Sequence, residues 1–440
     1  MELATLVAKV KAAGVVGAGG AGFPTHVKLN NRCETILVNA AECEPLLQVD
    51  QQLLQQKAQA LVDSLALVVE ATGAKKGIFG VKTKYQAALA ALHQAAAAQD
   101  KLEISLLEDF YPAGDEQVLV YEVLGKVVPQ GGIPLQVGVI VLNVETLLNI
   151  SRAFNGGAVT HKFVTVAGAV ANPVTVQVPL GTPVKSVIAL AGGSTLENYR
   201  VLEGGPMMGK EVHDLEQGIT KTTKGLIVLP AQHRLWRKKD VPSSVMLKRA
   251  MSVCCQCSAC TDLCPRHLLG HTIEPHRVLR NLVHNISNDI SGLTGTQLCS
   301  ECGVCDYYAC VMDISPRLLN VAVKRELAKQ GFRKAPGGEG KPHSQRQLRK
   351  IPLKRLISRL GLETYRKPAP LSGVKCEPDH VLLELKQHVG APCNPVVEEG
   401  TRVKVGQVVA EVPEGQLGSR IHASIAGTVV KVKPQIVITR

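Results

Sequence analysis

Nine of the thirteen cysteines lie between Cys254 and Cys310, and this cluster constrains the fold and the chemistry of the chain more than any other feature. The opening residues, MELATLVAKVKAAG, mix charged with apolar side chains and contain no cleavage site, so we expect a cytoplasmic protein rather than a secreted one. Thiols stay reduced in the cytoplasm, where clustered cysteines usually serve metal or redox chemistry instead of disulfides. The sequence therefore predicts a metal or redox centre in this part of the chain.

The first cysteine run, CCQCSACTDLCP, has the spacing C-x2-C-x2-C-x3-C-P when it is counted from Cys254. Bacterial ferredoxins bind [4Fe–4S] clusters with this run, in which the fourth thiolate, before proline, reaches a second cluster. A zinc site is the alternative, although zinc sites usually show two C-x2-C pairs and stop at four ligands. Cys255 would become a ligand only if the register moved by one. The predicted ligands are Cys254, Cys257, Cys260 and Cys264.

The second cysteine run, CSECGVCDYYAC, has the spacing C-x2-C-x2-C-x4-C, with one extra residue before its last cysteine and no following proline. Two such runs are typical of a two-cluster ferredoxin module, in which the fourth ligands are exchanged between the clusters. The expected ligand sets are Cys254, Cys257, Cys260 and Cys310 for one cluster, and Cys264, Cys299, Cys302 and Cys305 for the other. The remaining Cys33, Cys43, Cys376 and Cys393 are isolated, and we interpret them as small buried or surface residues.

The length of 440 residues favours several domains, and the texture of the sequence divides them. Residues 1–155 alternate strand-like runs with helical runs, which predicts an α/β domain with a parallel sheet covered on both faces. Residues 160–235 show short alternating runs and one helix, as in a small α+β module. The cysteine-rich region with helical flanks spans 240–330. A basic linker follows at 331–372, and the Val-rich strands with Gly turns at 373–440 predict a compact all-β module.

The charge of the chain is +13, and Gly331–Ser372 holds eleven Lys or Arg against two Glu. This segment is rich in Gly, Pro and Gln and has almost no aromatic residues to stack on bases, so we interpret it as a solvated linker and expect no nucleic-acid partner. The most apolar stretch, IPLQVGVIVLNVETLLNI, is interrupted by Asn143 and Glu145. It suits a buried strand and helix, and we expect no membrane span.

A glycine-rich stretch near the N-terminus, GVVGAGGAGFPTHVKL, contains the spacing Gly17-x-Gly19-x-x-Gly22. A dinucleotide-binding turn of the Rossmann type needs a strand before the glycines and a helix after them. Here the sequence predicts a helix before the glycines, and the clear strand ETILVNA comes after them. The pattern alone is therefore compatible with a nucleotide-binding loop and equally with a tight structural turn.

Four stretches in order, GAGGAGFPTHVKL, NAAECEP, YPAGDEQ and LNVET, resemble the flavin- and NADH-binding domain shared by the flavin subunit of respiratory complex I and the C subunit of the Rnf electron-transfer complex. The resemblance implies a Rossmann-like domain that binds FMN, with NADH stacked over the flavin ring. It implies that four glycines let the backbone approach both molecules: Gly17, Gly19, Gly20 and Gly22.

The resemblance also assigns roles to side chains. It places Lys28 at the FMN phosphate, and Phe23 and Glu44 near the nicotinamide nucleotide. Two positions depart from the complex I pattern: Ala18 stands where that pattern has Arg, and Ala41 where it has an acid, which moves the sequence toward the Rnf type and weakens the expectation of tight NADH binding. The residues expected to line the flavin site are Asn39, Glu42, Tyr111, Glu116, Asn143 and Thr146.

Two further modules carry a resemblance. The stretch VTVAGAVANPVTVQVPLGTPVKSVIALAGG resembles the SLBB-like β-grasp module that follows the flavin domain in these families, and the C-terminal stretch resembles a barrel-sandwich hybrid module of the biotinyl/lipoyl type. The latter lacks the Asp-Lys hairpin that accepts lipoate, so we expect a structural role. In the Rnf family this module precedes the flavin domain, whereas here it comes last. That order resembles the cobalamin reductases of propanediol-utilisation bacterial microcompartments.

The resemblance implies an enzyme that passes electrons from NADH through FMN and two [4Fe–4S] clusters to cobalamin, reducing cob(III)alamin to cob(II)alamin and so supporting coenzyme recycling for a diol dehydratase. It implies a place inside or attached to a microcompartment, with a shell protein and a cobalamin adenosyltransferase as partners. No catalytic side chain and no D-x-H-x-x-G corrinoid motif is evident. The alternatives are an Rnf-like NADH:ferredoxin oxidoreductase component and a non-enzymatic iron–sulfur conduit docked to a shell protein.

Overall fold

The N-terminal part of the protein is built on a parallel four-stranded sheet with the order β3-β2-β1-β5. The computed structural model describes residues 2–332, 334, 337–338 and 340–440. Neighbouring strands run parallel throughout the sheet, as the alternation of strands and helices predicted. The strands are β1 (Thr35–Ala40), β2 (Lys76–Lys82), β3 (Leu102–Leu107) and β5 (Val139–Asn143).

Helices cover both faces of this sheet, because alternate strand residues point to opposite sides. Ile36 and Val38 face the core formed with the larger helical layer, whereas Leu37 faces the α6 side. The larger layer contains α1 (Leu3–Ala12), α3 (Val49–Gln56), α4 (Ala58–Thr72), α5 (Gln86–Ala96) and α7 (Val144–Phe154), and the opposite face carries α6 (Glu116–Leu124). The single helix predicted before Gly73 is two helices, because Lys57, with φ −126° and ψ 23°, leaves the helical conformation between α3 and α4.

The glycine-rich stretch forms a closed loop after α1. Val16 and Pro24 form an antiparallel bridge, and the N–H of Gly17 donates to the carbonyl of Phe23 at 2.9 Å. A short helix, α2 (Thr25–Leu29), follows the loop before β1. The sequence predicted the helix before the glycines and the strand after them but missed α2.

Residues 161–230 form a five-stranded mixed sheet with the order β7-β6-β10-β8-β9 and one packed helix, α8 (Val184–Ala189). β10 lies parallel to β6 and antiparallel to β8. The strands are β6 (His161–Gly168), β7 (Val174–Pro179), β8 (Tyr199–Glu203), β9 (Lys210–Val212) and β10 (Gly225–Pro230).

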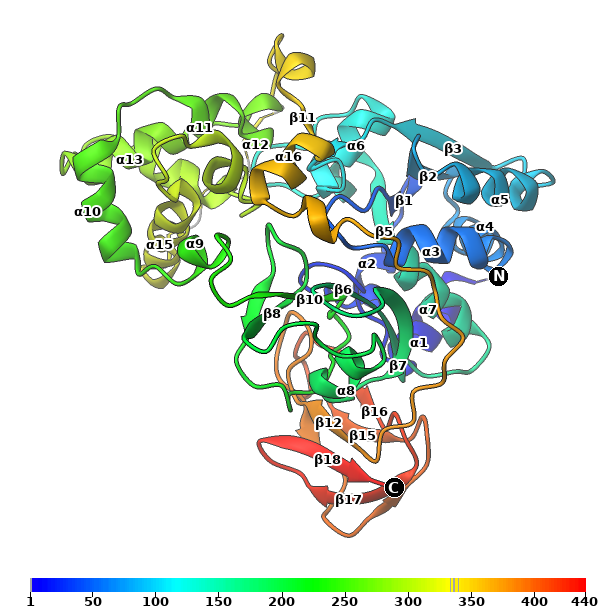
Figure 1. Cartoon of the computed structure of the whole chain (residues 1–440). Coiled ribbons are helices and arrows are strands. Elements are labelled where there is room, and N and C mark those ends of the chain that lie inside the picture. The colour runs from blue at the N-terminus through cyan, green and yellow to red at the C-terminus, as the bar shows by residue number, and fades with distance from the viewer. Residues whose placement is uncertain (1, 333, 335–336, 339) are drawn as a thin grey trace.

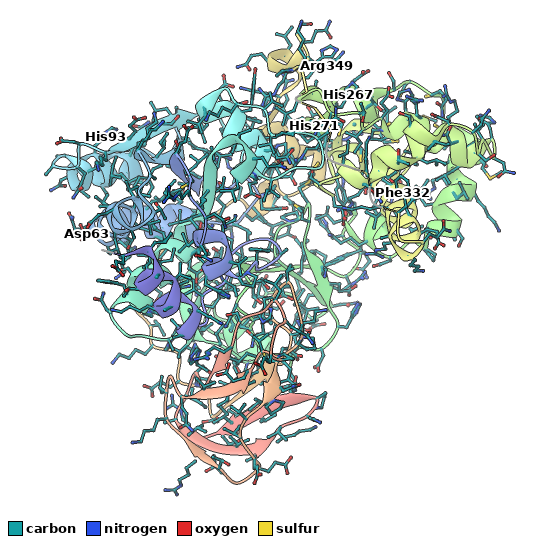
Figure 2. All side chains as sticks on the ribbon, turned by 180° about the vertical axis from the view of Figure 1, so that it is seen from behind. Asp63, His93, His267, His271, Phe332 and Arg349 are labelled. Carbon is teal, nitrogen blue, oxygen red and sulfur yellow. The ribbon has the colours of Figure 1, made fainter. Side chains whose placement is uncertain are left out.

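The cysteine-rich region is helical and lies on the opposite flank of the molecule from β2 and β3 (Figure 1). His271, labelled in Figure 2, is buried and donates through Nε2 to the carbonyl of Val128 at 3.1 Å, which ties this region to the loop after α6. The helices are α9 (Trp236–Lys239), α10 (Ser243–Val253), α11 (Ala259–Asp262), α12 (Pro265–Leu268), α13 (Pro275–Val283), α14 (Ile290–Thr294) and α15 (Pro316–Lys329), with a 3-10 turn at Gly295–Leu298 and a π-helical turn at Cys305–Ala309.

The prediction of a solvated linker at 331–372 is wrong for residues 346–360. β11 (Ile351–Pro352) pairs with β4 (Phe110–Tyr111), and α16 (Leu353–Leu360) buries its four leucine and isoleucine side chains between the cysteine-rich helices and the parallel-sheet domain. Figure 1 shows α16 in this position. The basic residues of a strongly amphipathic helix masked its apolar face in the composition. Residues 333, 335–336 and 339 of the predicted linker lie outside the described residues.

The C-terminal residues form two small antiparallel sheets. This module reaches the start of the chain, because Lys221 Nζ donates at 2.7 Å both to the carbonyl of Gly14 and to that of Arg420. Within the residues that the structure describes, no helix has the length and apolar character needed to cross a membrane. The strands are β12 (His380–Glu384), β14 (Arg402–Val403), β17 (Gly427–Lys431) and β18 (Gln435–Thr439) in one sheet, and β13 (Asn394–Pro395), β15 (Val408–Glu411) and β16 (Ile421–His422) in the other.

Candidate functional site

A cavity of about 570 Å³ lies at the carboxyl ends of β1 and β5. These two strands mark the point where the strand order of the sheet reverses, and open α/β sheets bind ligands at such switch points. The volume is that of a small-molecule or cofactor site. We call it the strand-end cavity.

The glycine loop, the turn after β1, the β4–α6 turn and the end of β5 line the strand-end cavity. These four segments are the ones that carry the four sequence motifs. All the residues predicted to contact FMN or NADH line it: Gly17, Gly19, Gly20, Gly22, Phe23, Lys28, Asn39, Glu42, Glu44, Tyr111, Glu116, Asn143 and Thr146. Their individual roles toward a bound molecule stay predictions.

The glycine loop is anchored at Ala18, the position where the complex I pattern has Arg. The N–H of Ala18 donates to Thr146 Oγ1 at 2.8 Å, and its carbonyl accepts from Lys162 Nζ at 2.8 Å. Lys162 also pairs with Glu145, and both side chains are buried. Beyond this anchor the loop is open, since a Cβ added to Gly20, whose φ is +68°, would meet no atom within 4 Å. The backbone there can approach a ligand closely.

Buried charges form one wall of the strand-end cavity. Lys224, which precedes β10, lies 2.5 Å from Asp50 Oδ2 and 2.9 Å from Glu42 Oε1. Burial alone would lower the pKa of Lys224, but the carboxylates of Asp50 and Glu42 outweigh it and raise that pKa above its usual range. Burial raises the pKa of Glu42 against the attraction of Lys224. Removing Lys224 would leave two buried carboxylates without their cation, at a cost of about 3–5 kcal/mol.

Three of the predicted polar residues have protein partners at the cavity wall. Lys28 Nζ donates to Glu116 Oε1 at 3.0 Å, so an incoming phosphate would share Lys28 with this carboxylate. Asn39 donates to the carbonyl of Gly114 at 2.8 Å. Asn143 donates to the Asp50 carboxylate at 3.2 Å. These bonds fix the side chains in the positions from which they face the cavity.

Glu44 connects the turn after β1 with the loop between β8 and β9. Its carboxylate accepts from the backbone N–H groups of Met207 and Met208 at 3.0 Å each. A side chain at Gly205 would collide with the carboxylate, because a Cβ there would lie 2.0 Å from Glu44 Oε2. Burial raises the pKa of Glu44 to about 7, against the stabilising effect of the two N–H groups. Glu44 therefore changes its protonation near neutral pH.

The cysteines surround two further cavities. The structure brings together the two sets that an exchange of fourth ligands requires, with Cys310 in the first set and Cys264 in the second, and Cys255 also lines the first cavity while its side chain is exposed. The distal cysteine cavity is lined by Cys254, Cys257, Cys260 and Cys310, and the proximal cysteine cavity by Cys264, Cys299, Cys302 and Cys305. That these sets bind clusters stays a prediction.

The loops around both cysteine cavities have the features of cluster-binding loops. Gln256, Ser258, Glu301 and Gly303 adopt left-handed φ values of 53°, 60°, 59° and 77°, which turn backbone N–H groups inward as in anion-binding nests. The N–H of Glu301 donates to Cys299 Sγ at 3.4 Å.

Burial favours the protonated form of these thiols unless a metal takes the place of the proton. Burial raises the pKa of the Cys260 and Cys264 thiols to about 12. Within the described parts of the chain, no three Cys, His, Asp or Glu side chains lie close enough to hold one metal ion. A cubane presents iron at four corners, so its thiolates need not approach one another.

The strand-end cavity and the proximal cysteine cavity adjoin each other, because Ser300 and Cys302 line both. Tyr111 Oη donates to the carbonyl of Cys302 at 2.7 Å, and Arg266 pairs with Asp115 at 2.9 Å. Arg266 Nε and Ser300 Oγ are buried and have no hydrogen-bond partner among the described residues, and both residues face the strand-end cavity. Buried orphan polar atoms of this kind suggest a ligand with oxygen or nitrogen atoms.

Sequence reasoning missed four residues of the cavity wall: Asp50, Lys224, Arg266 and Ser300. Asp50 and Lys224 lie outside every motif and 174 positions apart, so no local pattern could have paired them. Arg266 and Ser300 stand next to cysteine runs, and their neighbourhood was the one available signal.

The comparisons with known proteins match the whole chain in segments. Family models match as the Nuo51 FMN-binding domain at 10–152, the SLBB domain at 163–211, the 4Fe-4S dicluster domain at 253–315 and the RnfC barrel sandwich hybrid domain at 367–440. The chain is 45% identical over 432 residues to the cobalamin reductase PduS of Citrobacter freundii, covering 98% of this chain and 95% of that protein.

Two further relatives differ in how much they cover. The cobalamin reductase PduS of Salmonella typhimurium is 45% identical over 430 residues, which cover 98% of this chain and 95% of that protein. The Na(+)-translocating ferredoxin:NAD(+) oxidoreductase complex of Acetobacterium woodii has a component, its RnfC-type polypeptide, that is 36% identical over 262 residues, 58% of this chain and 56% of that polypeptide.

Proposed function

The chain belongs to the cobalamin reductase PduS family, and from that premise we propose that it carries electrons from NADH through the strand-end cavity, the proximal cysteine cavity and the distal cysteine cavity, in that order, to cobalamin. It is an oxidoreductase with an FMN-binding domain and a 4Fe-4S dicluster domain. The observation that carries the proposed order is the shared wall of Ser300 and Cys302 between the strand-end and proximal cavities.

The cofactors supply the change from electron pairs to single electrons: FMN accepts a hydride and releases electrons singly, and [4Fe–4S] clusters carry one at a time. The residues of the chain bind and orient. The open glycine loop offers its backbone to FMN and NADH, and Lys28 offers a cation to the FMN phosphate. Tyr111 holds the Cys302 loop against the strand-end cavity through its hydrogen bond to the Cys302 carbonyl. The buried group of Lys224, Asp50 and Glu42 excludes water from the inner wall.

The second half of the route uses the segment between the cysteine cavities. Cys305 and Cys310 belong to different cavities but are joined by one π-helical turn, Cys305–Ala309, and the N–H of Cys310 donates to the carbonyl of Cys305 at 3.2 Å. This short connection supports electron transfer from the proximal to the distal site.

The proposal extends to place and partners. Because the relatives that the chain matches almost end to end are PduS proteins, we infer that it works inside or attached to a propanediol-utilisation microcompartment. A shell protein and a cobalamin adenosyltransferase are the proposed partners.

Anaerobically prepared protein tests the proposal. We expect a flavin absorbance spectrum with roughly eight irons per chain, bleaching of the flavin by NADH, and reduction of cob(III)alamin at the same rate as NADH oxidation. Ferredoxin as acceptor is the control. A protein without flavin that still holds both clusters would indicate an electron conduit, and reduction of ferredoxin alone would indicate an Rnf-like activity. Either result contradicts the proposed route.

A further inference from the structure

A basic cavity of about 310 Å³ lies beside the distal cysteine cavity. Cys310 and Val311 line both cavities, so the basic cavity continues the series that begins at the strand ends. Its walls come from the segment around α9 and from the end of α16, which are distant in sequence and meet only in the fold. We call it the exit cavity.

The exit cavity has an excess of positive charge. Arg234, Arg237, Lys238 and Arg359 line it, with Asp313 as the opposing carboxylate. Asp313 pairs with Lys238 at 3.2 Å.

The three arginines differ from Lys238 in having no carboxylate partner among the described residues. Arg234 donates only to the backbone carbonyl of Arg359, and no partner is found in that part of the chain for the side chains of Arg237 and Arg359. Three exposed guanidinium groups without carboxylates attract an anion, and guanidinium geometry suits phosphate.

The floor next to this charge is apolar. Val311 is 69% exposed and Met312 is 38% exposed, and both also line the distal cysteine cavity. Soluble proteins seldom leave such side chains open beside a redox centre without a contact to make. An acceptor that docks here needs an apolar face for Val311 and Met312 and an anionic group for the arginines.

We propose that the exit cavity binds the phosphodiester of the nucleotide loop of cobalamin, with the corrin ring over Val311 and Met312 beside the distal site. The inference rests on the proposed function. For each NADH oxidised to NAD⁺, one proton is released and two electrons leave singly, each reducing one cob(III)alamin to cob(II)alamin.

A larger basic cavity, of about 1140 Å³, lies between the β6–β7 hairpin and the C-terminal sheets and includes Arg402 and Lys404. It shares no lining residue with either cysteine cavity, so an acceptor there would lack a neighbouring cluster. This cavity provides a matched control, because Arg402 and Lys404 are exposed and basic but outside the proposed route.

The test compares two acceptors in three proteins: the wild type, the double variant Arg237→Gln with Arg359→Gln, and the control Arg402→Gln with Lys404→Gln. Cobinamide lacks the nucleotide loop and its phosphodiester. In the exit-cavity variant we expect KM for cobalamin to rise about tenfold, with KM for cobinamide and flavin bleaching by NADH unchanged. Equilibrium dialysis of cobalamin against the anaerobic holoprotein should give the same rise in Kd. Added salt should raise KM for cobalamin in the wild type and less in the variant.

The outcomes separate the inference from the proposed function. Unchanged KM and Kd for cobalamin in the exit-cavity variant, or a rise only in the Arg402 and Lys404 control, would overturn the exit cavity as the corrinoid site. An equal rise for cobalamin and cobinamide would also overturn it, since the arginines would then not read the phosphodiester. If the wild type fails to bleach its flavin with NADH, the proposed function itself fails.

Discussion

The two cysteine cavities hold the same number of predicted ligands in opposite settings. The proximal cavity lies under the parallel-sheet domain, shares Cys302 with the strand-end cavity and has Cys264 and Cys305 buried. The distal cavity has Cys257 exposed and Val311 beside it in solvent. Solvent exposure and hydrogen bonding tune iron–sulfur sites, so equal ligands in unequal surroundings can do different work. The difference indicates that one site receives electrons inside the protein and the other delivers them at its surface.

The strongest way to break this comparison is to remove one ligand from each cavity. We expect Cys302→Ser and Cys257→Ser each to lower the iron content from roughly eight to roughly four per chain and to reduce cobalamin reduction at least about 100-fold. Rapid mixing with NADH distinguishes the two variants. With Cys257→Ser the remaining cluster should still become reduced, whereas with Cys302→Ser the flavin should hold its electrons. The reverse assignment would contradict the order of the route.

Loss of metal should follow the same division. On exposure to air and a chelator, we expect iron to leave in two phases of about four irons each, the first about tenfold faster because the distal site is open to solvent. Iron release and visible absorbance followed together measure both phases. Cys257→Ser should lack the fast phase. A single phase for all the iron in the wild type would show that the two settings do not differ in protection.

Ion pairs near the two cavities should differ in what they contribute to stability. Arg266 pairs with Asp115 with side chains 13% and 10% exposed, whereas Arg249 pairs with Asp313 at 43% and 59%. Arg266→Gln should lower the free energy of unfolding by about 3 kcal/mol, because Asp115 stays buried without its cation. Arg249→Gln, the matched change on the distal side, should cost less than about 1 kcal/mol. Thermal unfolding of the holoproteins measures both, and equal losses would contradict the comparison.

A pH titration sharpens the contrast at the buried end of the route. The pKa of Glu44 is raised from its ordinary 4.5 to about 7, so its contribution to stability is fully present below pH 4.5 and is lost as the pH rises through 7. Relative to Glu44→Gln, the wild type should therefore lose about 2 kcal/mol between pH 5 and pH 7.5. Thermal unfolding of both proteins across this range is the measurement. Parallel curves for the two proteins would mean that Glu44 titrates at its ordinary value.

The sequence predicted those parts of the site that local spacing or a family motif carries. The cysteine spacing predicted which thiols meet, including the exchange that joins Cys264 to the second run, and the motifs predicted the four segments around the strand-end cavity. The basic exit cavity was out of reach. Arg237 and Arg359 have no pattern in common, and they meet because α16 packs beside α9.

The fold shows the same division. Alternating strands and helices predicted the parallel sheet, since its strands and helices repeat at local periods. Composition failed for α16, because its Lys and Arg residues hid an apolar face that only the heptad-like spacing of Leu353, Leu356, Ile357 and Leu360 reveals. A net count of charges reports on solvation of a segment, whereas packing depends on which side of a helix the charges occupy.

The contact of the C-terminal module with the start of the chain has an evolutionary consequence. Lys221 joins the carbonyls of Gly14 and Arg420, so the last module of the sequence is a spatial neighbour of the first helix. A circularly permuted gene that moved residues 373–440 in front of residue 1, with a suitable linker, could keep this contact. The place of such a module in a sequence therefore records the history of gene rearrangement more than the architecture of the protein.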